Sequence, residues 1–491
     1  MTSPSDSLLC HNVDRRTFLK LLSLASSLPM VQARRPTGPG KKVVILGAGL
    51  AGLAAGWNLV QRGYDVIIVE GQGRAGGRVK TVRKPFQKGG YAEAGAVRIP
   101  SNHQFTMKYI KLMGLASKLR DYADPKGAHL WHVQGKRFIT PTGEWPLDGL
   151  TPAEKADPFG QLMKYWGDGF KAVGNPLAPD FPSPAARELD AYRMDEYFKR
   201  QGASDAWIQL LYASEGHFGD INALWVTAVE GALLGSGPVT TYGLVGGNDQ
   251  LPRALATSLG SRVRFRTRVD RIAHTADGVT ITVTDASGQH EIAADYCICT
   301  LPFPLLREVA ITPSFSETKM DAIRSYGLAD AARVSLQTRT RFWEQDPLGR
   351  LGGLNMVGTD TTWERIWNTS ALQPDKKMGM LHVYMFEDHA QALGAIPPAE
   401  RVAKTTDGVA PCLPQLGEQT VASSVTVWHE DPWARGAVAL LHPHRFETHW
   451  PAARRAEGRV HFAGEHTSVW IGFQNGALES AERCVSEITG A

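Results

Sequence analysis

Residues 42–52 read KVVILGAGLAG, an apolar β-rich run that leads directly into three spaced glycines. Leu53 to Leu59 continues with helical character, so this part of the chain predicts a strand, a glycine turn and a helix. In such a unit Gly47 makes the tight turn, Gly49 lets the backbone approach a pyrophosphate, and Gly52 lets the helix pack closely on the strand. The helix N-terminus attracts the anion.

A second apolar run, Asp65 to Val69, ends in Glu70. At this spacing after the glycines, a carboxylate accepts hydrogen bonds from a ribose 2′-hydroxyl and disfavours a 2′-phosphate. The two runs together predict a Rossmann-type α/β domain that binds a dinucleotide. The alternative is a glycine turn in an ordinary βαβ unit.

The segment that begins at Glu70 carries a more specific pattern. Residues 70–78 read EGQGRAGGR, and Arg74 and Arg78 are cations able to neutralise phosphate. This segment resembles the ExxxRxGGR signature of the flavin amine oxidase superfamily, which includes monoamine oxidases, polyamine oxidases and L-amino acid oxidases. For Arg78 the alternative is an ion pair with a surface acid, which adds little stability.

Three later stretches resemble the same superfamily, in the family's order. Residues 95–100 read GAVRIP, like the GxxRxP segment of amino acid oxidases. The glycine pair in residues 245–247 resembles the one ahead of the adenine-side strand, where Val269 matches a residue that contacts adenine through its backbone. FAGEHT at 462–467 and WIGFQNGA at 470–477 resemble the closing flavin segment.

The resemblance implies an α/β (α+β) protein with a Rossmann-type, glutathione-reductase-like FAD-binding domain, a sheet-based substrate domain and a helical insertion. It implies FAD as the cofactor and no metal. Glu465 is expected to bind the ribityl chain, with a surface carboxylate as the alternative. The residues expected to hold FAD are Gly47, Gly49, Leu50, Ala51, Gly52, Glu70, Gly71, Arg74, Arg78, Gly95, Ala96, Val97, Arg98, Val269, Gly464, Glu465, Gly472, Phe473, Gln474, Gly476 and Ala477.

The matches also divide the chain. Residues 42–120, 236–310 and 441–491 are expected to build the FAD-binding domain, and residues 311–440, which contain β-rich runs, the substrate domain. Residues 121–235 carry no dinucleotide signal and are expected to form a helical lid. Within them, apolar residues at three- and four-residue intervals predict helices at Ala191 to Gln201, Ala206 to Glu215 and Ala223 to Leu234.

Arg98 is the residue that suggests the substrate. A buried carboxylate requires a fixed cationic partner, and a planar guanidinium makes two parallel hydrogen bonds to it. We therefore expect Arg98 to bind the α-carboxylate of an L-amino acid, with O2 as the second substrate. A simple amine has no such group. The alternative is a structural arginine that pairs with the phosphates or with Glu93.

The resemblance implies that the substrate Cα gives a hydride to the flavin, which dioxygen reoxidises to yield hydrogen peroxide, a 2-oxo acid and ammonia. No protein general base is needed when the amine is neutral. Phe473 and Trp470 are expected to shape the side-chain pocket or the flavin face, although an aromatic at a helix start is often core.

Two positions depart from the family's pattern. Where most members carry a lysine near the flavin N5, this chain has Arg333, which we expect in a catalytic position; the alternative is a surface strand. Where many amino acid oxidases have a second carboxylate-binding side chain, a tyrosine, Asn368 stands and is expected to donate a hydrogen bond.

The sequence leaves the side-chain preference open between a basic amino acid and a broad or aromatic one. A basic side chain needs a carboxylate, and the lid offers Glu215, Asp220 and Glu230, with His217 nearby. Solvated carboxylates on helix faces are the commoner case, which favours the broad or aromatic specificity.

Composition excludes some classes. The 491 residues carry 53 Lys+Arg against 49 Asp+Glu, a near balance with no clustered basic face, so a nucleic-acid partner is disfavoured. With 43% hydrophobic residues, wholesale disorder is excluded. Cys297 and Cys299 read as a buried strand rather than a metal site. A homodimer or larger homo-oligomer is compatible with these features.

Arg15 and Arg16 precede an apolar run, Leu21 to Met30, that is too short to span a bilayer. Residues 1–33 resemble a bacterial twin-arginine export signal, which predicts a periplasmic or secreted protein without stable membrane insertion. The alternative is a disordered basic tail.

Three other functions compete with the amino acid oxidase. A flavin-dependent amino acid 2-monooxygenase would share the site but produce an amide. An amine or polyamine oxidase would not need Arg98. A non-catalytic exported flavoprotein would bind the cofactor without turnover.

Overall fold

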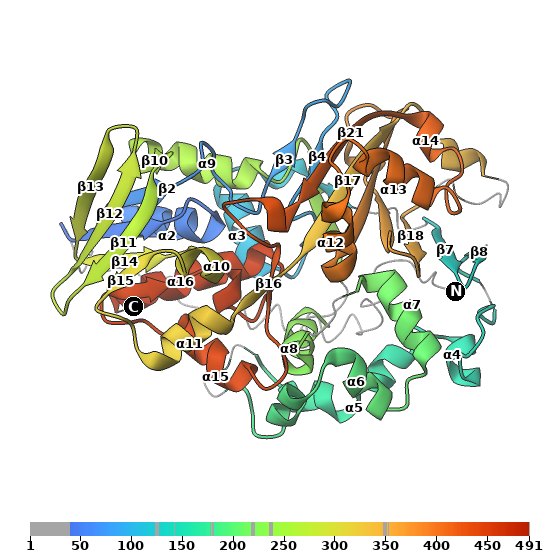
Figure 1. Ribbon diagram of the computed structural model, residues 1–491, viewed down its shortest axis with the longest axis horizontal. Helices are drawn as coiled ribbons and strands as arrows, with labels where there is room; N and C mark the ends of the chain where they lie inside the picture. The colour runs from blue at the N-terminus through green and yellow to red at the C-terminus, as the bar shows by residue number, and fades with distance from the viewer. Residues whose placement is uncertain are drawn as a thin grey trace.

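The computed structural model of the protein describes residues 40–122, 127–141, 143–176, 178, 181–217, 221–234, 239–346, 351 and 353–490. The molecule is elongated (Figure 1). A parallel sheet with an attached meander lies at one end, a seven-stranded sheet at the other, and a layer of helices runs along one side. The expected signal, residues 1–33, lies outside the described residues.

A five-stranded parallel sheet forms the dinucleotide-binding end. Its strands come from distant parts of the chain, as the resemblance implies, and follow the order β10 (Val263–Phe265), β2 (Asp65–Glu70), β1 (Lys42–Leu46), β14 (Tyr296–Cys299) and β23 (Val460–Phe462). Strands β1, β14 and β23 are short and almost wholly buried, as parallel strands covered on both faces are, whereas the edge strand β10 is mostly exposed.

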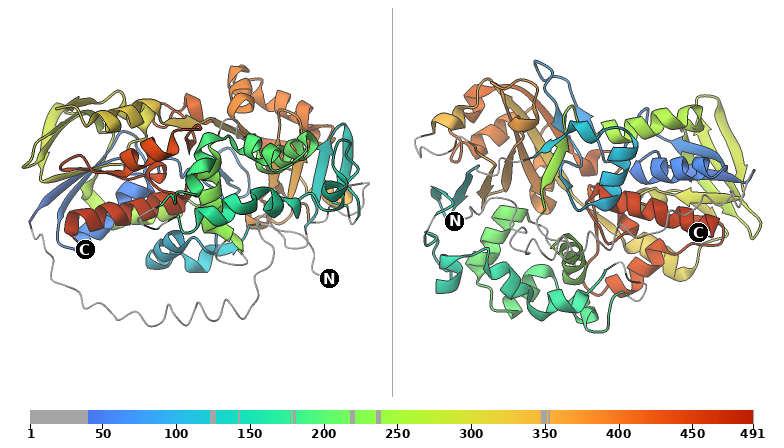
Figure 2. Two further views of the ribbon diagram at one scale, coloured as in Figure 1. Left: turned by 90° about the horizontal axis from the view of Figure 1, so that it is seen from below. Right: turned by 180° about the vertical axis from the view of Figure 1, so that it is seen from behind.

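Two helices cover this sheet. Helix α2 (Leu50–Gln61) follows β1, and α16 (Gln474–Thr489) packs against α2 (Figure 2). Gly47 has a φ of +104°, which favours glycine. A Cβ on Gly52 would lie 2.0 Å from the carbonyl oxygen of Gly47, so only glycine lets α2 start this close to the turn.

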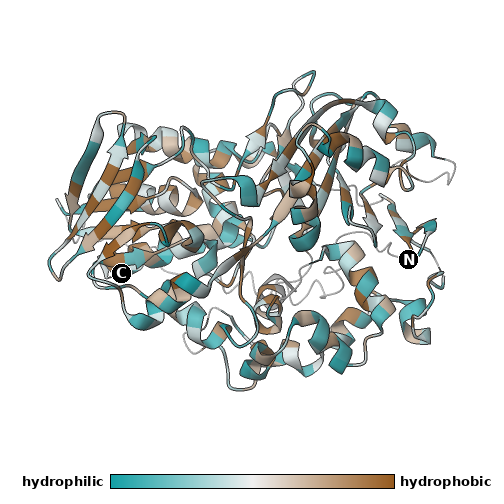
Figure 3. Cartoon of the chain, viewed as in Figure 1, coloured by the Kyte–Doolittle hydropathy of each residue, from teal (hydrophilic) through white to brown (hydrophobic). Residues whose placement is uncertain are grey.

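A four-stranded sheet lies beyond the parallel one, in the order β13 (Gly288–Ala294), β12 (Val279–Asp285), β11 (Arg268–His274) and β15 (Ala310–Thr312). Hydrophobic and hydrophilic residues alternate along its meander (Figure 3), and burial alternates along β12. One face is therefore core and the other faces solvent.

The seven-stranded sheet forms the other end of the molecule. Its order is β21 (Thr420–Val427), β17 (Ala331–Thr338), β20 (Gly379–Phe386), β19 (Arg365–Asn368), β18 (Met356–Thr359), β7 (His129–Val133) and β8 (Lys136–Ile139). Strands β7 and β8 belong to the segment expected to be a mostly helical lid. Instead β7 pairs with β18 and β8 pairs with β7, so both strands extend the sheet. The adjacent apolar residues Leu130 and Trp131 of β7 are both buried, which fits a strand covered on both faces.

Helices α4 (Pro152–Ala156), α5 (Gln161–Val173), α6 (Met194–Arg200), α7 (Asp205–Glu215) and α8 (Ala223–Leu234) form the layer along the side. Large aromatic side chains, Trp166, Phe198, Trp207 and Trp225, fill its core. The Ser204 hydroxyl caps α7 by accepting from the Trp207 N–H. We call these five helices the lid.

The remaining elements connect these layers: β3 (Thr81–Val82), β4 (Ala92–Glu93), β5 (Ile99–Pro100), α3 (Gln104–Leu112), β6 (Leu119–Asp121), β9 (Thr241–Leu244), α9 (Gln250–Leu259), α10 (Phe303–Leu306), α11 (Glu317–Ser325), β16 (Gly327–Ala329), α12 (Glu387–Ala395), α13 (Arg401–Val409), α14 (Leu416–Gln419), β22 (Val438–Leu440) and α15 (Phe446–Arg454). Within the described ranges, no helix combines the length and apolar character needed to cross a membrane.

Candidate functional site

A cavity of about 890 Å³ extends from the glycine turn after β1 to the seven-stranded sheet and the lid. Most residues expected to hold the cofactor line it: Gly47, Gly49, Leu50, Ala51, Glu70, Gly71, Arg78, Gly95, Ala96, Val97, Arg98, Val269, Gly464, Glu465, Gly472, Phe473, Gln474 and Ala477. Segments that are far apart in the chain therefore face one space of the size typical for a ligand.

The turn after β1 forms the phosphate end of this cavity. Glu70 accepts hydrogen bonds from the backbone N–H of Ala48 (2.8 Å) and of Gln72 (2.8 Å). Burial raises the pKa of Glu70, and these two bonds oppose that rise. A Cβ on Gly49 would meet nothing within 4 Å, so open space lies over the N-terminus of α2, where an anion is favoured.

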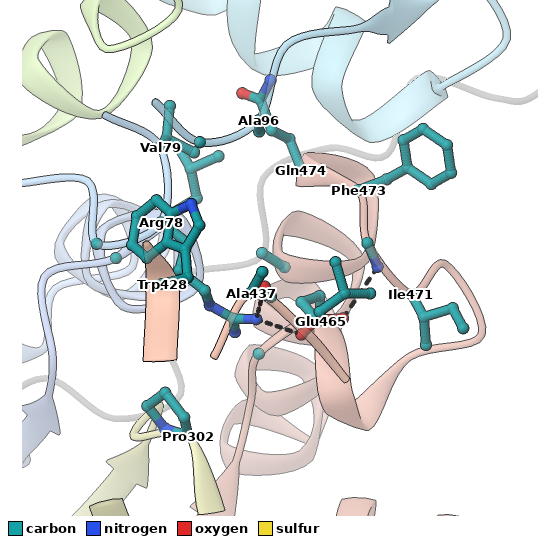
Figure 4. A pocket seen from close by; sticks show the side chains of 18 of the residues that line it. Arg78, Val79, Ala96, Pro302, Trp428, Ala437, Glu465, Ile471, Phe473 and Gln474 are labelled. Carbon is teal, nitrogen blue, oxygen red and sulfur yellow. Dashed lines mark hydrogen bonds and ion pairs between the residues drawn. The ribbon is translucent and has the colours of Figure 1, made fainter. Parts of the chain in front are cut away.

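Arg78 and Glu465 join the first and last parts of the cavity wall (Figure 4). Arg78 Nη1 donates to Glu465 Oε1 (2.6 Å) and to the carbonyl of Ala437 (2.7 Å). Glu465 also accepts from the backbone N–H of Ala439 (3.1 Å) and of Gly472 (3.0 Å). The pair is therefore part of the wall itself, and Arg78 has a buried acid rather than a surface acid as its partner.

Gln474 is the first residue of α16 and faces the cavity (Figure 4). Its side chain is 5% exposed, and both of its polar atoms, Oε1 and Nε2, lack a partner among the described residues. A buried amide without a partner is costly unless a ligand satisfies it. With the open glycine turn, this amide indicates that the residues present fit a flavin dinucleotide.

Three residues expected at the cofactor do not line the cavity. Gly52 packs α2 on the turn, and Gly476 serves a similar packing role, since its Cβ would lie 2.4 Å from the carbonyl oxygen of Trp470. Arg74 points its guanidinium at the carbonyl of Gly77 (2.9 Å) and lines a neighbouring pocket instead. Its structural role is thus to hold the glycine-rich segment.

Arg98 lies just before β5 and lines the cavity. Its guanidinium carbon lies 5.4 Å from the ring centroid of Trp367. Among the described residues, no carboxylate or hydrogen-bond acceptor pairs with it. The alternative of an ion pair with Glu93 is not seen, because the Glu93 carboxylate accepts from Asn248 N–H (2.7 Å) and Thr81 Oγ1 (2.8 Å). The cavity thus contains an unpaired cation suited to an anionic group.

One face of the seven-stranded sheet forms the wall beside Arg98. Arg333 on β17, Tyr384 on β20 and Arg365 on β19 are register partners in one row, and all three line the cavity. The guanidinium carbon of Arg333 lies 4.2 Å from the ring centroid of Tyr384 and that of Arg365 lies 5.5 Å from it. His382 and Trp367 form the next row on the same face.

Arg333 is buried rather than on a surface strand. Its Nη1 donates to the carbonyls of Glu93 (2.5 Å) and Gly95 (2.7 Å). These carbonyls belong to the segment that leads to Arg98. Arg333 therefore holds the backbone that positions the unpaired guanidinium.

Two residues expected to touch the substrate lie outside the cavity wall. Asn368 is the neighbour of Trp367 on β19, and because side chains alternate along a strand it points to the opposite face. Its amide donates to the carbonyl of Leu354 (2.5 Å) and its Oδ1 accepts from Ser370. Trp470 is packed beside His103 instead, and Phe473 lines the cavity.

The lid closes the cavity with apolar side chains, namely Leu162, Trp166, Met194, Phe198, Leu211, Val226 and Val229, and Ile221, just before α8, adds to them. Its one described carboxylate in the cavity is Glu215. His217 does not line the cavity, Asp220 lies outside the described residues, and the side chain of Glu230 is likewise not described.

Sequence reasoning missed Arg365, Tyr384 and His382. A sequence signal exists for two of these residues. His382 and Tyr384 stand two residues apart in a β-rich run, and side chains at that spacing share one face of a strand. That pattern predicts a shared face but not which face meets the cavity. The pairing of β20 with β17 and β19 decides this.

Comparisons with known proteins agree with this arrangement. Residues 50–489 match the family described as flavin containing amine oxidoreductase. The flavin-dependent L-tryptophan oxidase RebO of Lentzea aerocolonigenes is 29% identical over 91% of this chain and 98% of its own length. The L-amino-acid oxidase of Siganus canaliculatus is also 29% identical, over 91% of this chain and 85% of its own.

Solved structures resemble the fold. Putrescine oxidase bound to putrescine has a TM-score of 0.79 at 20% identity, covering 92% of this chain and 99% of that one. Cyclohexylamine oxidase from Brevibacterium oxydans IH-35A has a TM-score of 0.78 at 21% identity, with coverages of 92% and 99%. At these identities the likeness concerns the fold alone.

Proposed function

The chain belongs to the family of flavin-containing amine oxidoreductases, and we propose that it is an FAD-dependent L-amino acid oxidase. The reaction is L-amino acid + O2 + H2O → 2-oxo acid + NH3 + H2O2. The observation that carries the proposal is the unpaired guanidinium of Arg98, which faces the same cavity as the glycine turn and Gln474. The curated relatives named L-amino-acid oxidase and L-tryptophan oxidase support it.

The wall residues divide the tasks of binding. When bound, FAD supplies an acceptor for a hydride equivalent and passes two electrons to dioxygen. Gly49 and the first turn of α2 would hold its pyrophosphate, and Glu70 would bind a ribose. FAD would in turn supply the hydrogen-bond partners that the buried amide of Gln474 lacks.

The substrate is held from its acid end. Arg98 binds the α-carboxylate through two parallel hydrogen bonds, which fixes the orientation of the neighbouring Cα–H. Arg333 keeps the backbone before Arg98 in place through the carbonyls of Glu93 and Gly95. The apolar lid excludes water from the imine until product release. The reactive amine is neutral, so no protein base is assigned.

A product analysis tests this function. We expect the purified protein, supplied with a panel of L-amino acids in air, to release hydrogen peroxide and 2-oxo acid in a 1:1 ratio. The decarboxylated amine of the best substrate should give no peroxide above background. An amide and CO2 as products would instead identify a 2-monooxygenase, equal turnover of the amine would identify an amine oxidase, and no turnover with any compound would leave only a flavin-binding protein.

We further propose that residues 1–33 direct export of the folded protein through the twin-arginine route. The support is the Arg15-Arg16 pair ahead of the short apolar run Leu21 to Met30. Replacing both arginines with lysine, R15K/R16K, should retain the protein in the cytoplasm of a bacterial host while the native signal delivers it to the periplasm. Fractionation with a cytoplasmic marker measures this, and equal distribution of the two forms would contradict the proposal.

A further inference from the structure

Glu215 and Arg365 meet where the lid faces the seven-stranded sheet. Glu215 is the last residue of α7, and Arg365 is the first residue of β19. Arg365 Nη1 lies 3.8 Å from Glu215 Oε2, which is ion-pairing distance but longer than a hydrogen bond. Both side chains line the cavity. They thus form a charge pair within reach of a ligand.

Arg365 is deeply buried although its charge is barely satisfied. It is 1% exposed, its Nε has no partner among the described residues, and its one hydrogen bond is a long one to the carbonyl of Ser214 (3.4 Å). Aromatic rings surround it, with Phe386 at 5.3 Å from ring centroid to guanidinium carbon. Burial lowers its pKa, and Glu215 is the first charge that opposes this.

The nearby Glu364 is not available to a ligand in the same way. Its Oε1 accepts from the backbone N–H of Phe386 (3.0 Å) and contacts His389 Nδ1 (2.7 Å), and its Oε2 accepts from the backbone N–H of His217 (3.2 Å). Glu364 does not line the cavity. Arg333 of the same row already donates to the carbonyls of Glu93 and Gly95. Where the lid meets this wall, the charge that faces a substrate side chain is therefore that of the Glu215–Arg365 pair, whose sum is zero.

We propose that the Glu215–Arg365 pair makes the oxidase selective for neutral side chains and rejects both basic and acidic ones. This inference rests on the proposed function and adds its substrate class. A basic side chain that reached Glu215 would place a second cation beside buried Arg365. An acidic side chain that reached Arg365 would place a second anion beside Glu215. Apart from Glu215, the described lid side chains that line the cavity are apolar, so they offer an added charge no other partner.

Pairs of substrates with side chains of similar size separate the effect of side-chain charge from the effect of side-chain size. L-norleucine and L-lysine compare a neutral with a basic side chain, and L-glutamine and L-glutamate compare a neutral with an acidic one. For the native holoenzyme we expect kcat/KM to be at least 100-fold higher for the neutral member of each pair. Comparable values for L-lysine or L-glutamate would overturn the proposal.

Single replacements should shift the preference in opposite directions. Glu215→Gln leaves Arg365 unpaired, so the glutamate-to-glutamine ratio of kcat/KM should rise tenfold or more while the lysine-to-norleucine ratio does not rise. Arg365→Met leaves Glu215 unpaired, so the lysine-to-norleucine ratio should rise tenfold or more while the glutamate ratio does not. The control is Glu308→Gln, another carboxylate of the cavity wall, which should shift neither ratio.

These experiments distinguish failure of the proposed pair from failure of the proposed oxidase function. If the native protein oxidises no amino acid, the function is wrong. If it oxidises L-norleucine but Glu215→Gln leaves both ratios unchanged, or shifts both in the same direction, only the pair's role is wrong. Flavin absorbance and near-UV circular dichroism establish folding of each variant. Since Glu215 is at the rim of the lid and partly exposed, its variant decides the question even if Arg365→Met does not fold.

Discussion

The charged side chains of the cavity differ in what holds them. Arg333 donates to two backbone carbonyls and Arg78 to a buried carboxylate, so each has a structural partner. Arg98 has none among the described residues. An unpaired cation in a partly enclosed cavity stabilises a bound anion more than a paired one would, because binding does not first break an ion pair. This difference supports the proposal that Arg98 binds the substrate.

The sequence alone could indicate Arg98 as a candidate because the residue stands in a motif of short spacing, and the structure places it on the cavity wall. Asn368 was expected beside it, but a one-residue difference along a strand decides which face a side chain occupies, and the partner strand sets that face. Trp367 faces the cavity, and Asn368 ties β19 to Leu354 and Ser370.

Replacing Asn368 therefore tests the assignment of faces on β19. Asn368→Ala removes hydrogen bonds to Leu354 and Ser370, so the free energy of unfolding should fall by about 1–3 kcal/mol while KM changes less than twofold. Trp367→Ala should instead raise KM. Urea unfolding and steady-state kinetics measure both. A tenfold rise in KM for Asn368→Ala at unchanged stability would contradict the structure.

Glu93 gives a prediction for pH. Burial raises its pKa to about 7, well above the ordinary value of 4.5 that the carboxyl has in an unfolded chain. The folded state therefore binds the proton more tightly, and this contribution to stability is full below pH about 4.5 and is lost as pH rises through about 7. In Glu93→Gln this loss should be absent, so the native protein should lose up to about 3 kcal/mol relative to the variant between those pH values. Urea midpoints across this range measure the difference, and parallel pH profiles would exclude a raised pKa.

At the scale of elements, the strand–turn–helix unit at 42–61 was predicted because its periodicity and glycines are local features. Strands β7 and β8 were not, since they complete a sheet whose other strands begin only at Ala331. Local sequence patterns specify a helix or a strand, but long-range packing determines which strand it pairs with. The same limit applies to Arg365 and Glu215, which approach each other across 150 residues.

The start of α2 provides the prediction at this scale. In Gly52→Ala the new Cβ would lie 2.0 Å from the backbone oxygen of Gly47, which cannot rotate away, so the helix must move from the phosphate turn. We expect the purified variant to be colourless. The matched control is Gly56→Ala one turn later. Its Cβ would come closest to the movable Cδ1 of Ile68 at 2.7 Å and otherwise meet only isoleucine side-chain atoms at 3.4 Å or more, so this variant should retain flavin. Equal flavin content in the two variants would contradict this role of Gly52.

At the scale of the whole molecule, the cavity is built where three layers meet. Figure 1 shows these layers as the parallel sheet, the seven-stranded sheet and the lid. The parallel sheet gives the phosphate end of the cavity, the seven-stranded sheet gives the charged wall, and the lid closes the space with apolar side chains. The family resemblance predicted this division because its motifs are spread along the chain. It did not predict the lining of the lid, which depends on how five helices pack.

The Arg78–Glu465 pair connects the first and last of the cofactor-binding segments, 387 residues apart. Glu465→Gln leaves Arg78 without its charged partner, so the free energy of unfolding should fall by about 2 kcal/mol or more, with faster flavin release. The control is Glu482→Gln on α16, which removes an exposed pair with Lys108 and should cost less than about 1 kcal/mol. Thermal unfolding followed by flavin fluorescence compares the stability of the two variants. An equal loss of stability in both would contradict the proposed role of the Arg78–Glu465 pair.

The central claim is that Arg98 binds the acid end of the substrate. Anaerobic mixing with L-norleucine, followed by absorbance of the bound flavin, measures this most directly. We expect the native protein to bleach, Arg98→Ala to bleach at least 100-fold more slowly at the same concentration, and a control surface variant, Arg324→Ala, to behave as the native protein. Bleaching of Arg98→Ala at the native rate, with L-norleucine or with pentylamine, would contradict the account.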